Sequence, residues 1–250
     1  MPLLSLLKKV IPVRVRRAAR ILLRGEPSRA GAPENPFQAA GREIEKRGLF
    51  VGCPLEYFET TSKDLFCLAL LEGLKPSASV LEVGCGCLRT GYHFIRYLMP
   101  GCYFGVEPNV AMLDAGRELL LGTLEPQKLP HFNYNDTFSF SVFDTTFDFV
   151  VACSIWSHAS KGQIARMLDE FRRYANPGGK FITSWIPPRP GMPDYEAKGW
   201  VGRSHRCDTP GMVAHSREWL TEAATTRGLA IREFDGFTTL NQTWLIITRS

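Results

Sequence analysis

The sequence predicts an α/β fold built on one doubly wound, mostly parallel, seven-stranded sheet with an antiparallel edge strand. Short β-type segments alternate with helical segments from residue 80 onward, a pattern typical of parallel strands joined by crossover helices on both faces of a sheet. The last two β-type segments follow each other through Gly236 and Asn241, which indicates an antiparallel pair at one edge. The predicted strands are residues 80–83, 103–106, 131–134, 147–152, 180–185, 230–234 and 243–248.

Helices are expected between these strands and ahead of the first one. Helical patterns occupy residues 90–98, 110–121, 162–174 and 216–227. Before the sheet, residues 37–47 favour a short helix, and Ser62 is placed to cap a second helix that runs to Gly73. The sheet domain is therefore expected to carry an N-terminal helical extension.

The composition is that of an ordinary globular protein whose basic residues are unevenly distributed. The 250-residue chain is 44% hydrophobic and 22% charged, which suits one main domain. Seven of the 30 Lys and Arg residues precede Gly25 with no acidic residue among them, so the rest of the chain has 23 basic against 25 acidic residues. This nearly neutral body argues against a nucleic-acid partner.

The first 36 residues divide into a basic arm and a linker. Residues 1–24 mix leucines with the seven basic residues and read as an amphipathic arm, which could contact an anionic membrane surface. A solvated or self-packed helix and an organellar transit peptide are the alternatives. Residues 25–36 are rich in Gly, Pro and Ala and predict a linker, so the folded body is expected at 37–250.

Cysteine usage indicates a reducing compartment. The seven cysteines are odd in number and show no C-x-x-C spacing, so neither a disulfide framework nor a metal site is expected. No run of about 18 uncharged apolar residues predicts a membrane span. The sequence favours a cytoplasmic protein, with peripheral membrane contact through residues 1–24 as one interpretation.

The turn after the first predicted strand carries the chemical signal. Gly84, Cys85 and Gly86 form a glycine-rich turn, and glycines at such a position allow positive φ angles and close approach of a ligand. Glu107 ends the next strand 23 residues beyond Gly84, a spacing suited to accepting hydrogen bonds from ribose hydroxyls. The pattern predicts a nucleoside-containing cofactor.

Two residues separate this turn from a dinucleotide-binding fingerprint. Arg89 stands where the third glycine of that fingerprint is wanted. Glu82 adds a carboxylate that a pyrophosphate would disfavour but an ammonium or sulfonium group would suit. A nicotinamide-dependent oxidoreductase is therefore the less favoured class.

Five motifs extend the argument to a family. The segments VLEVGCG, YFGVEPN, FNYND, FDFVVACSIWSH and NPGGKFITSW occur in this order and spacing. Together they resemble the class I S-adenosylmethionine-dependent methyltransferases over residues 65–250. The resemblance implies a Rossmann-like fold, S-adenosylmethionine as cofactor and a methyltransferase domain at 37–250.

The resemblance also implies a set of cofactor contacts at the ends of the first four strands. Glu107 would hold the ribose and Asp136 the adenine amino group. Leu88 departs from the family, which often has a glycine there, so Arg89 is expected to meet the cofactor carboxylate instead. The residues expected to contact the cofactor are Glu82, Gly84, Cys85, Gly86, Arg89, Glu107, Asp136 and Ser154.

The substrate side depends on residues after the fourth strand and on a long connection. His158 is a candidate general base for a hydroxyl or amine acceptor, with loop capping as its alternative role. Trp156 is a candidate substrate wall, with core packing as the alternative. The proline-rich stretch 186–213, called the flap below, is too long for an ordinary connection and could cover the site. Its Tyr195, Trp200 and His205 are candidate substrate-binding residues.

The predicted function is methyl transfer from S-adenosylmethionine to an oxygen, nitrogen or carbon nucleophile of a small-molecule, lipid or glycan acceptor. A non-catalytic cofactor-binding or membrane-associated scaffold with the same fold is the alternative from another class. Neither the identity of the acceptor nor the oligomeric state can be read from the sequence.

Overall fold

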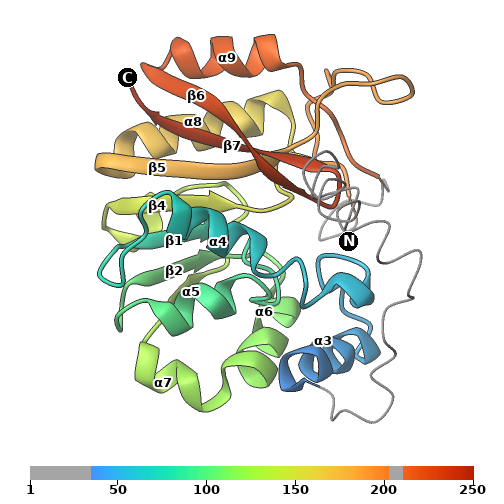
Figure 1. Cartoon of the computed structure of the whole chain (residues 1–250), viewed down its shortest axis with the longest axis vertical. Coiled ribbons are helices and arrows are strands. Elements are labelled where there is room, and N and C mark those ends of the chain that lie inside the picture. Colours follow the sequence, from blue (N-terminus) through green and yellow to red (C-terminus); the bar gives the residue numbers. More distant parts are fainter. Residues whose placement is uncertain (1–34, 203–210) are drawn as a thin grey trace, which may run out of the picture. The chain divides into compact units, whose positions relative to one another are not determined.

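The computed structural model describes residues 35–202 and 211–250. The predicted basic arm, nearly all of the predicted linker and His205 lie outside these residues. Residues Pro36–Ser250 form a unit around one seven-stranded sheet (Figure 1). The strands are β1 Val80–Val83, β2 Tyr103–Val106, β3 His131–Asn133, β4 Phe147–Ala152, β5 Ala175–Trp185, β6 Leu229–Thr239 and β7 Gln242–Arg249.

The strand order confirms the predicted doubly wound sheet. The order is β3-β2-β1-β4-β5-β7-β6, and β1 to β5 are all parallel to their neighbours. β7 lies between β5 and β6 and is antiparallel to both. The winding therefore reverses at β1 and β4, the position where ligands bind in open α/β sheets.

The antiparallel pair at the edge turns at Asn241, one of the two predicted turn residues, but not at Gly236. Leu240 and Asn241 have φ angles of 48° and 62° and form a two-residue turn between the paired residues Thr239 and Gln242. Two positive φ angles are what a tight hairpin of this kind requires. Gly236 instead lies inside β6, where the register shifts between Phe234 and Thr239.

The helices follow the predicted segments closely. They are α3 Pro36–Lys46, α4 Asp64–Leu71, α5 Gly91–Tyr97, α6 Val110–Gly116, α7 Glu125–Lys128, α8 Lys161–Tyr174 and α9 Arg217–Thr225. The segment predicted as one helix over 110–121 divides into α6 and a π-helical turn at Arg117–Leu121. α3 also includes Pro36, which the sequence assigns to the linker.

One predicted cap is wrong. Lys63, not Ser62, is the residue before α4, and no side chain caps that helix. The Ser62 hydroxyl donates to the carbonyl oxygen of Glu59 at 2.7 Å and lies 2.9 Å from Nε2 of His93. A contact with a distant helix has thus replaced the local cap, because Ser62 is fully buried against α5.

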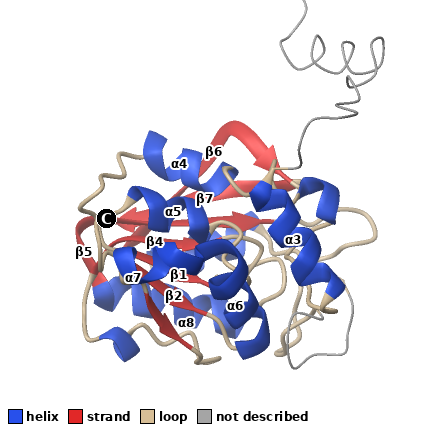
Figure 2. Cartoon of the chain, turned by 90° about the horizontal axis from the view of Figure 1, so that it is seen from below, coloured by secondary structure: helices blue, strands red, loops and turns tan. Residues whose placement is uncertain are grey.

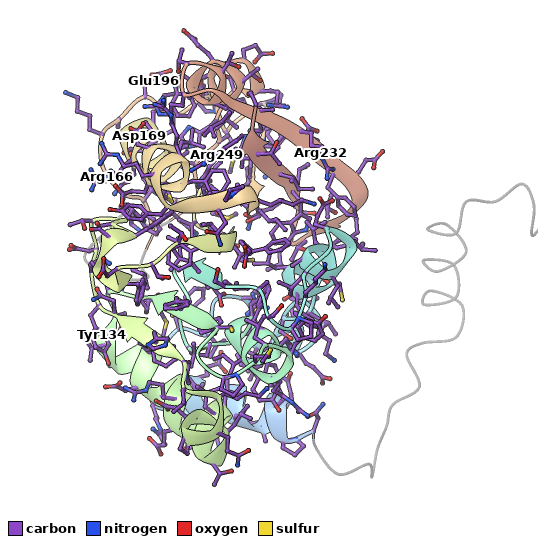
Figure 3. The ribbon with its side chains drawn as sticks, turned by 90° about the vertical axis from the view of Figure 1, so that its left-hand side faces the viewer. Tyr134, Arg166, Asp169, Glu196, Arg232 and Arg249 are labelled. Atoms are coloured by element: carbon purple, nitrogen blue, oxygen red, sulfur yellow. The ribbon has the colours of Figure 1, made fainter. Side chains whose placement is uncertain are left out.

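Helices cover both faces of the sheet (Figures 1 and 2). Alternate residues of each central strand point to opposite faces, so Val80 joins one apolar cluster and Leu81 the other. α3, α4, α5 and α6 contribute to the first cluster, and α8 and α9 to the second. Arg166 and Asp169 of α8 lie on the outer side of the second layer (Figure 3). The sheet is therefore buried on both faces, and the carboxyl ends of its parallel strands lie along one edge.

None of the helices within the described ranges is long and apolar enough to cross a bilayer.

Candidate active site

A cavity of about 890 Å³ opens at the carboxyl ends of the parallel strands. Its walls come from the residues after β1, β2, β3 and β4, from residues 50–54 before the sheet, and from the hairpin turn at 240–242. Two parts of the flap, Trp200 with Gly202 and Gly211 with Met212, also line it. The cavity is large enough for a nucleoside cofactor together with a small acceptor.

The glycine turn forms the floor of this cavity. Gly84 and Gly86 have φ angles of 71° and 56°, a backbone region that favours glycine. The backbone N–H groups of Gly84 and Cys85 both donate to the carbonyl oxygen of Val106, at 2.8 and 3.1 Å. A Cβ atom on Gly84 would lie 2.2 Å from Cδ1 of Ile155. The turn thus brings bare backbone to the cavity surface.

Glu107 ties this turn to the next strand. Its two carboxylate oxygens accept one hydrogen bond each, from the N–H of Gly86 at 2.9 Å and from the N–H of Asn109 at 2.8 Å. Burial raises the pKa of the carboxyl, and these two N–H groups oppose the rise. A carboxylate has about four acceptor positions, so positions remain for hydroxyl groups of a ligand.

Glu82 is a second buried carboxyl in the cavity wall. Burial raises its pKa to about 8, against the opposing effects of the Tyr103 hydroxyl, which donates to it at 2.6 Å, and of Arg89. A carboxyl with this pKa is largely protonated at neutral pH, and a cationic group nearby would favour its ionised form.

Arg89 is 7% exposed and lines the cavity beside residues 50–54. Its Nη1 donates to the Thr61 hydroxyl at 2.6 Å. One hydrogen bond leaves most of the five guanidinium donors for other groups. Leu88, at the position where the family often has glycine, has a φ of 63°, and its side chain is fully buried in the core. The backbone thus keeps a glycine-like conformation there without glycine.

The residues after β3 form the opposite end of the cavity. Asp136 and Asn135 both line it. The Asn135 side chain accepts hydrogen bonds from the N–H groups of Thr137 and Ser139, at 3.2 and 3.3 Å, and so shapes this turn. Asp136 is exposed at the cavity wall, while Cys85 is buried and burial raises the pKa of its thiol.

Ser154 and His158 line the cavity after β4. Ser154 has a φ of 57° and contacts Ser184 and Gln242. His158 Nδ1 lies 2.7 Å from the carbonyl oxygen of Val201, so this nitrogen carries a proton, and the ring stacks on Trp200 at 5.5 Å. Burial lowers the His158 pKa, opposed by the carbonyl groups of Val201 and Gly211. His158 therefore fastens the flap to the loop after β4.

The remaining predicted substrate residues lie elsewhere. Trp156 is fully buried and packs edge-on against Phe181 in the core, so it does not form a cavity wall. The Tyr195 hydroxyl donates to the carbonyl oxygen of Gly199 at 3.0 Å, and this side chain is not part of the cavity lining. Both positions follow from the direction of the local backbone, which sequence spacing alone does not determine.

Several lining residues carried no sequence signal. Residues 50–54 precede the sheet, and the turn at 240–242 belongs to its far edge. Phe138 lies in an irregular segment, and Met212 lies in the predicted flap but was not among its candidate substrate-binding residues. The strand-end rule identifies residues that directly follow parallel strands, so it could not have found these. Within the described ranges, no group of three His, Cys, Asp or Glu side chains is placed to hold a metal ion.

Comparison with known proteins agrees with this geometry. Residues 81–181 match the sequence model of the family described as "Methyltransferase domain". A protein named uncharacterized methyltransferase C1B3.06c, from Schizosaccharomyces pombe, is 31% identical over 114 residues. That match covers 44% of this chain and 40% of the relative, so the chain spans less than half the length of the curated relative.

Solved methyltransferases have the same fold. Magnesium protoporphyrin IX methyltransferase from Synechocystis PCC 6803, crystallised with bound SAM, matches 88% of this chain and all of its own with a TM-score of 0.60 and 14% identity. The sugar N-methyltransferase KedS8 from Streptoalloteichus sp ATCC 53650 matches 83% of this chain and 92% of its own with a TM-score of 0.57 and 18% identity. The fold is therefore the one that these solved methyltransferases share, and residues 81–181 of this chain match a methyltransferase domain.

Proposed function

We propose that this protein transfers a methyl group from S-adenosylmethionine to a small-molecule acceptor. The observation that carries the proposal is the position of Glu107. This buried carboxylate follows β2 and accepts a hydrogen bond from the N–H of Gly86 at the cavity wall. It stands beside two left-handed glycines in a cavity large enough for the cofactor. The solved structure of the Synechocystis enzyme contains SAM, and a second structure of that enzyme contains SAH.

The charges of the cavity support a cationic cofactor. Among the described lining residues, Glu82, Glu107 and Asp136 are acidic and Arg89 is the single Lys or Arg. An excess of carboxylates stabilises an ammonium and a sulfonium group and disfavours a pyrophosphate. This distribution supports S-adenosylmethionine over a nicotinamide dinucleotide.

The residues of the cavity can be assigned to parts of the cofactor. Glu107 would accept hydrogen bonds from the ribose hydroxyls, and Asp136 from the adenine amino group. Arg89 would pair with the cofactor carboxylate, and Glu82 would face its ammonium group. The turn of Gly84, Cys85 and Gly86 would lie against the methionine portion.

When bound, S-adenosylmethionine supplies a methyl group already activated by the positive charge on sulfur. The contribution of the chain is to align this group with an oxygen, nitrogen or carbon nucleophile and to exclude water. His158, which faces the cavity, is the nearby candidate for accepting a proton from the nucleophile. The acceptor is proposed to be a small molecule or a glycan, in keeping with the porphyrin and sugar methyltransferases that share the fold. A lipid acceptor is retained because of the basic arm.

Calorimetry with S-adenosylmethionine tests the proposal. We expect Glu107→Ala to weaken binding by tenfold or more, because hydrogen bonds to a charged group contribute about 1.5–3 kcal/mol each. Glu222→Ala, on the exposed side of α9, is the matched control and should bind as the unaltered protein does. Thermal unfolding of both variants checks that they are folded.

Two results would contradict the proposal: no binding of S-adenosylmethionine by the unaltered protein, or equal affinity in Glu107→Ala. Binding without transfer of a labelled methyl group to a broad acceptor panel would instead favour the non-catalytic scaffold.

A further inference from the structure

Three residues form a closed ring of hydrogen bonds beside the cavity, in which Ser154 takes part through its backbone N–H and its hydroxyl. The backbone N–H of Ser154 donates to the Ser184 hydroxyl at 2.6 Å. The Ser184 hydroxyl donates to Oε1 of Gln242 at 2.8 Å, and Nε2 of Gln242 donates to the Ser154 hydroxyl oxygen at 2.7 Å. Ser184 and Gln242 are buried, so the ring is held rigidly by β5 and the hairpin.

The ring determines whether the Ser154 hydroxyl donates or accepts a hydrogen bond toward the cavity. The Gln242 amide oxygen faces the Ser184 hydroxyl and accepts its proton, which directs the Gln242 amide N–H toward Ser154. Ser154 then accepts from Gln242 and keeps its own O–H proton. Within the described chain, the remaining neighbour of this hydroxyl is the Cys153 sulfur, a weak acceptor 3.9 Å away. Ser154 is therefore a hydrogen-bond donor on the cavity wall.

This donor lies away from the nucleoside end of the cavity. Ser154 follows β4, whereas Glu107 follows β2, two strands away in the sheet. Neighbouring strands are separated by about 4.8 Å, which places the two strand ends roughly 10 Å apart. Gln242 belongs to β7, still further from β2. The donor thus belongs to the half of the cavity that the acceptor would occupy.

Aromatic side chains line the cavity from His158, after β4, to Phe138, after β3. Trp200 stacks on His158 at 5.5 Å and on Phe138 at 6.3 Å, with an angle of 27° between the planes of each pair. All three line the cavity, together with the exposed apolar side chains of Phe50 and Met212. Flat, apolar walls favour an aromatic ligand, and the acidic excess of the lining disfavours an anionic one.

We propose that Ser154, oriented by Gln242, donates a hydrogen bond to the oxygen of an uncharged aromatic acceptor bound against Trp200. Ser154 is the residue that contacts the acceptor, and Gln242 is a positioning residue that acts through Ser154. The assignment of the ligand as a methyl acceptor rests on the proposed methyltransferase function, whereas the donor and the aromatic wall do not.

Two probes of equal shape test the donor. Acetophenone carries a carbonyl oxygen that can only accept a hydrogen bond, and α-methylstyrene has a CH₂ group in its place. Their affinities are measured by ligand-observed NMR on the full chain, with and without S-adenosylhomocysteine. The preference is the ratio of the α-methylstyrene Kd to the acetophenone Kd. We expect this ratio to be about tenfold larger in the unaltered protein than in the variants that lose the donor, because tenfold in affinity is the contribution of about one buried hydrogen bond.

The protein variants separate a donor from a merely structural role. In Gln242→Glu a carboxylate accepts from both serines, so the Ser154 proton turns toward position 242 and away from the cavity. Gln242→Glu and Ser154→Ala should both lose the preference for acetophenone, and the double variant should lose no more than either alone. Gln127→Glu, an exposed residue of α7 with the same change of charge, should keep it. Calorimetry with S-adenosylhomocysteine should give affinities within twofold for Gln127→Glu and the unaltered protein.

Three results would overturn the proposal. They are no binding of acetophenone by the unaltered protein, a preference that survives in Gln242→Glu, or a further loss when Gln242→Glu is added to Ser154→Ala. Failure of S-adenosylhomocysteine to bind the unaltered protein would instead contradict the proposed function, while the probe preference would still report on the donor.

Discussion

Replacing Glu82 by Gln should make the protein more stable, and increasingly so as the pH rises. Glu82 is 3% exposed and its carboxyl has a pKa of about 8, compared with 4.5 for an unperturbed group. Between these two values the unfolded chain loses a proton at this position while the folded chain keeps it. The unfolded state therefore binds fewer protons, and the free energy of unfolding falls as the pH rises.

The magnitude follows from the size of the shift. Each pH unit within this window changes the contribution of one such group by about 1.36 kcal/mol. Between pH 5.5 and 7.5 the stability of the unaltered protein relative to Glu82→Gln should therefore fall by about 2.5 kcal/mol. Below about pH 4 and above about pH 9 the difference should no longer change. Gln can still accept the hydrogen bond from Tyr103, so the variant should retain the local packing.

Urea unfolding followed by circular dichroism at several pH values measures this difference. Glu222→Gln, which changes an exposed carboxyl on α9, provides the control and should follow the unaltered protein at every pH. Parallel stability curves for Glu82→Gln and the unaltered protein would refute the argument, because they would mean that Glu82 ionises equally in both states.

Three further predictions concern the turn, the core and the arm. Gly84→Ala should lower the free energy of unfolding, measured with urea, by about 1–2 kcal/mol because φ is 71°. Gly162→Ala on α8, with open space around it, should raise it by about 0.5 kcal/mol. Equal effects of the two variants would contradict the role of the turn. Trp156→Ala should lower the free energy of unfolding by about 3–5 kcal/mol in the same assay and leave the affinity for S-adenosylmethionine within twofold by calorimetry. An unchanged stability would contradict the core role of Trp156 and favour a role in substrate binding. Replacing the four arginines at positions 14–20 by Gln should reduce co-sedimentation with phosphatidylserine vesicles, since each basic residue near such a surface contributes about 1 kcal/mol; equal recovery would rule out a membrane role for the arm.

Much of the fold was predictable because its signals are local. β1, β2 and β4 are short apolar segments that are largely buried, so they begin and end at the predicted residues. β5 begins at Ala175, five residues before the prediction, because the segment containing Pro177 and two glycines still pairs with β4 across a shift in register. Turn residues inside a strand do not reveal that pairing.

The cofactor side of the site was also accessible from sequence. Residues that directly follow parallel strands must meet at one edge of the sheet, which is why Gly84, Glu107 and Asp136 line one cavity. The acceptor side was not accessible in this way. Trp156 and His158 are two residues apart, yet one is buried in the core and the other lines the cavity.

The sequence by itself determined the order of strands and helices, the glycine turn and the carboxylate after β2, because periodicity and strand ends are properties of short segments. Only the tertiary structure decided that Gln242 lies beside Ser154, 88 residues away. That contact depends on β7 entering the sheet between β5 and β6 and on its antiparallel register with β5. Registers of this kind come from packing across the whole sheet, which no single segment of the sequence encodes.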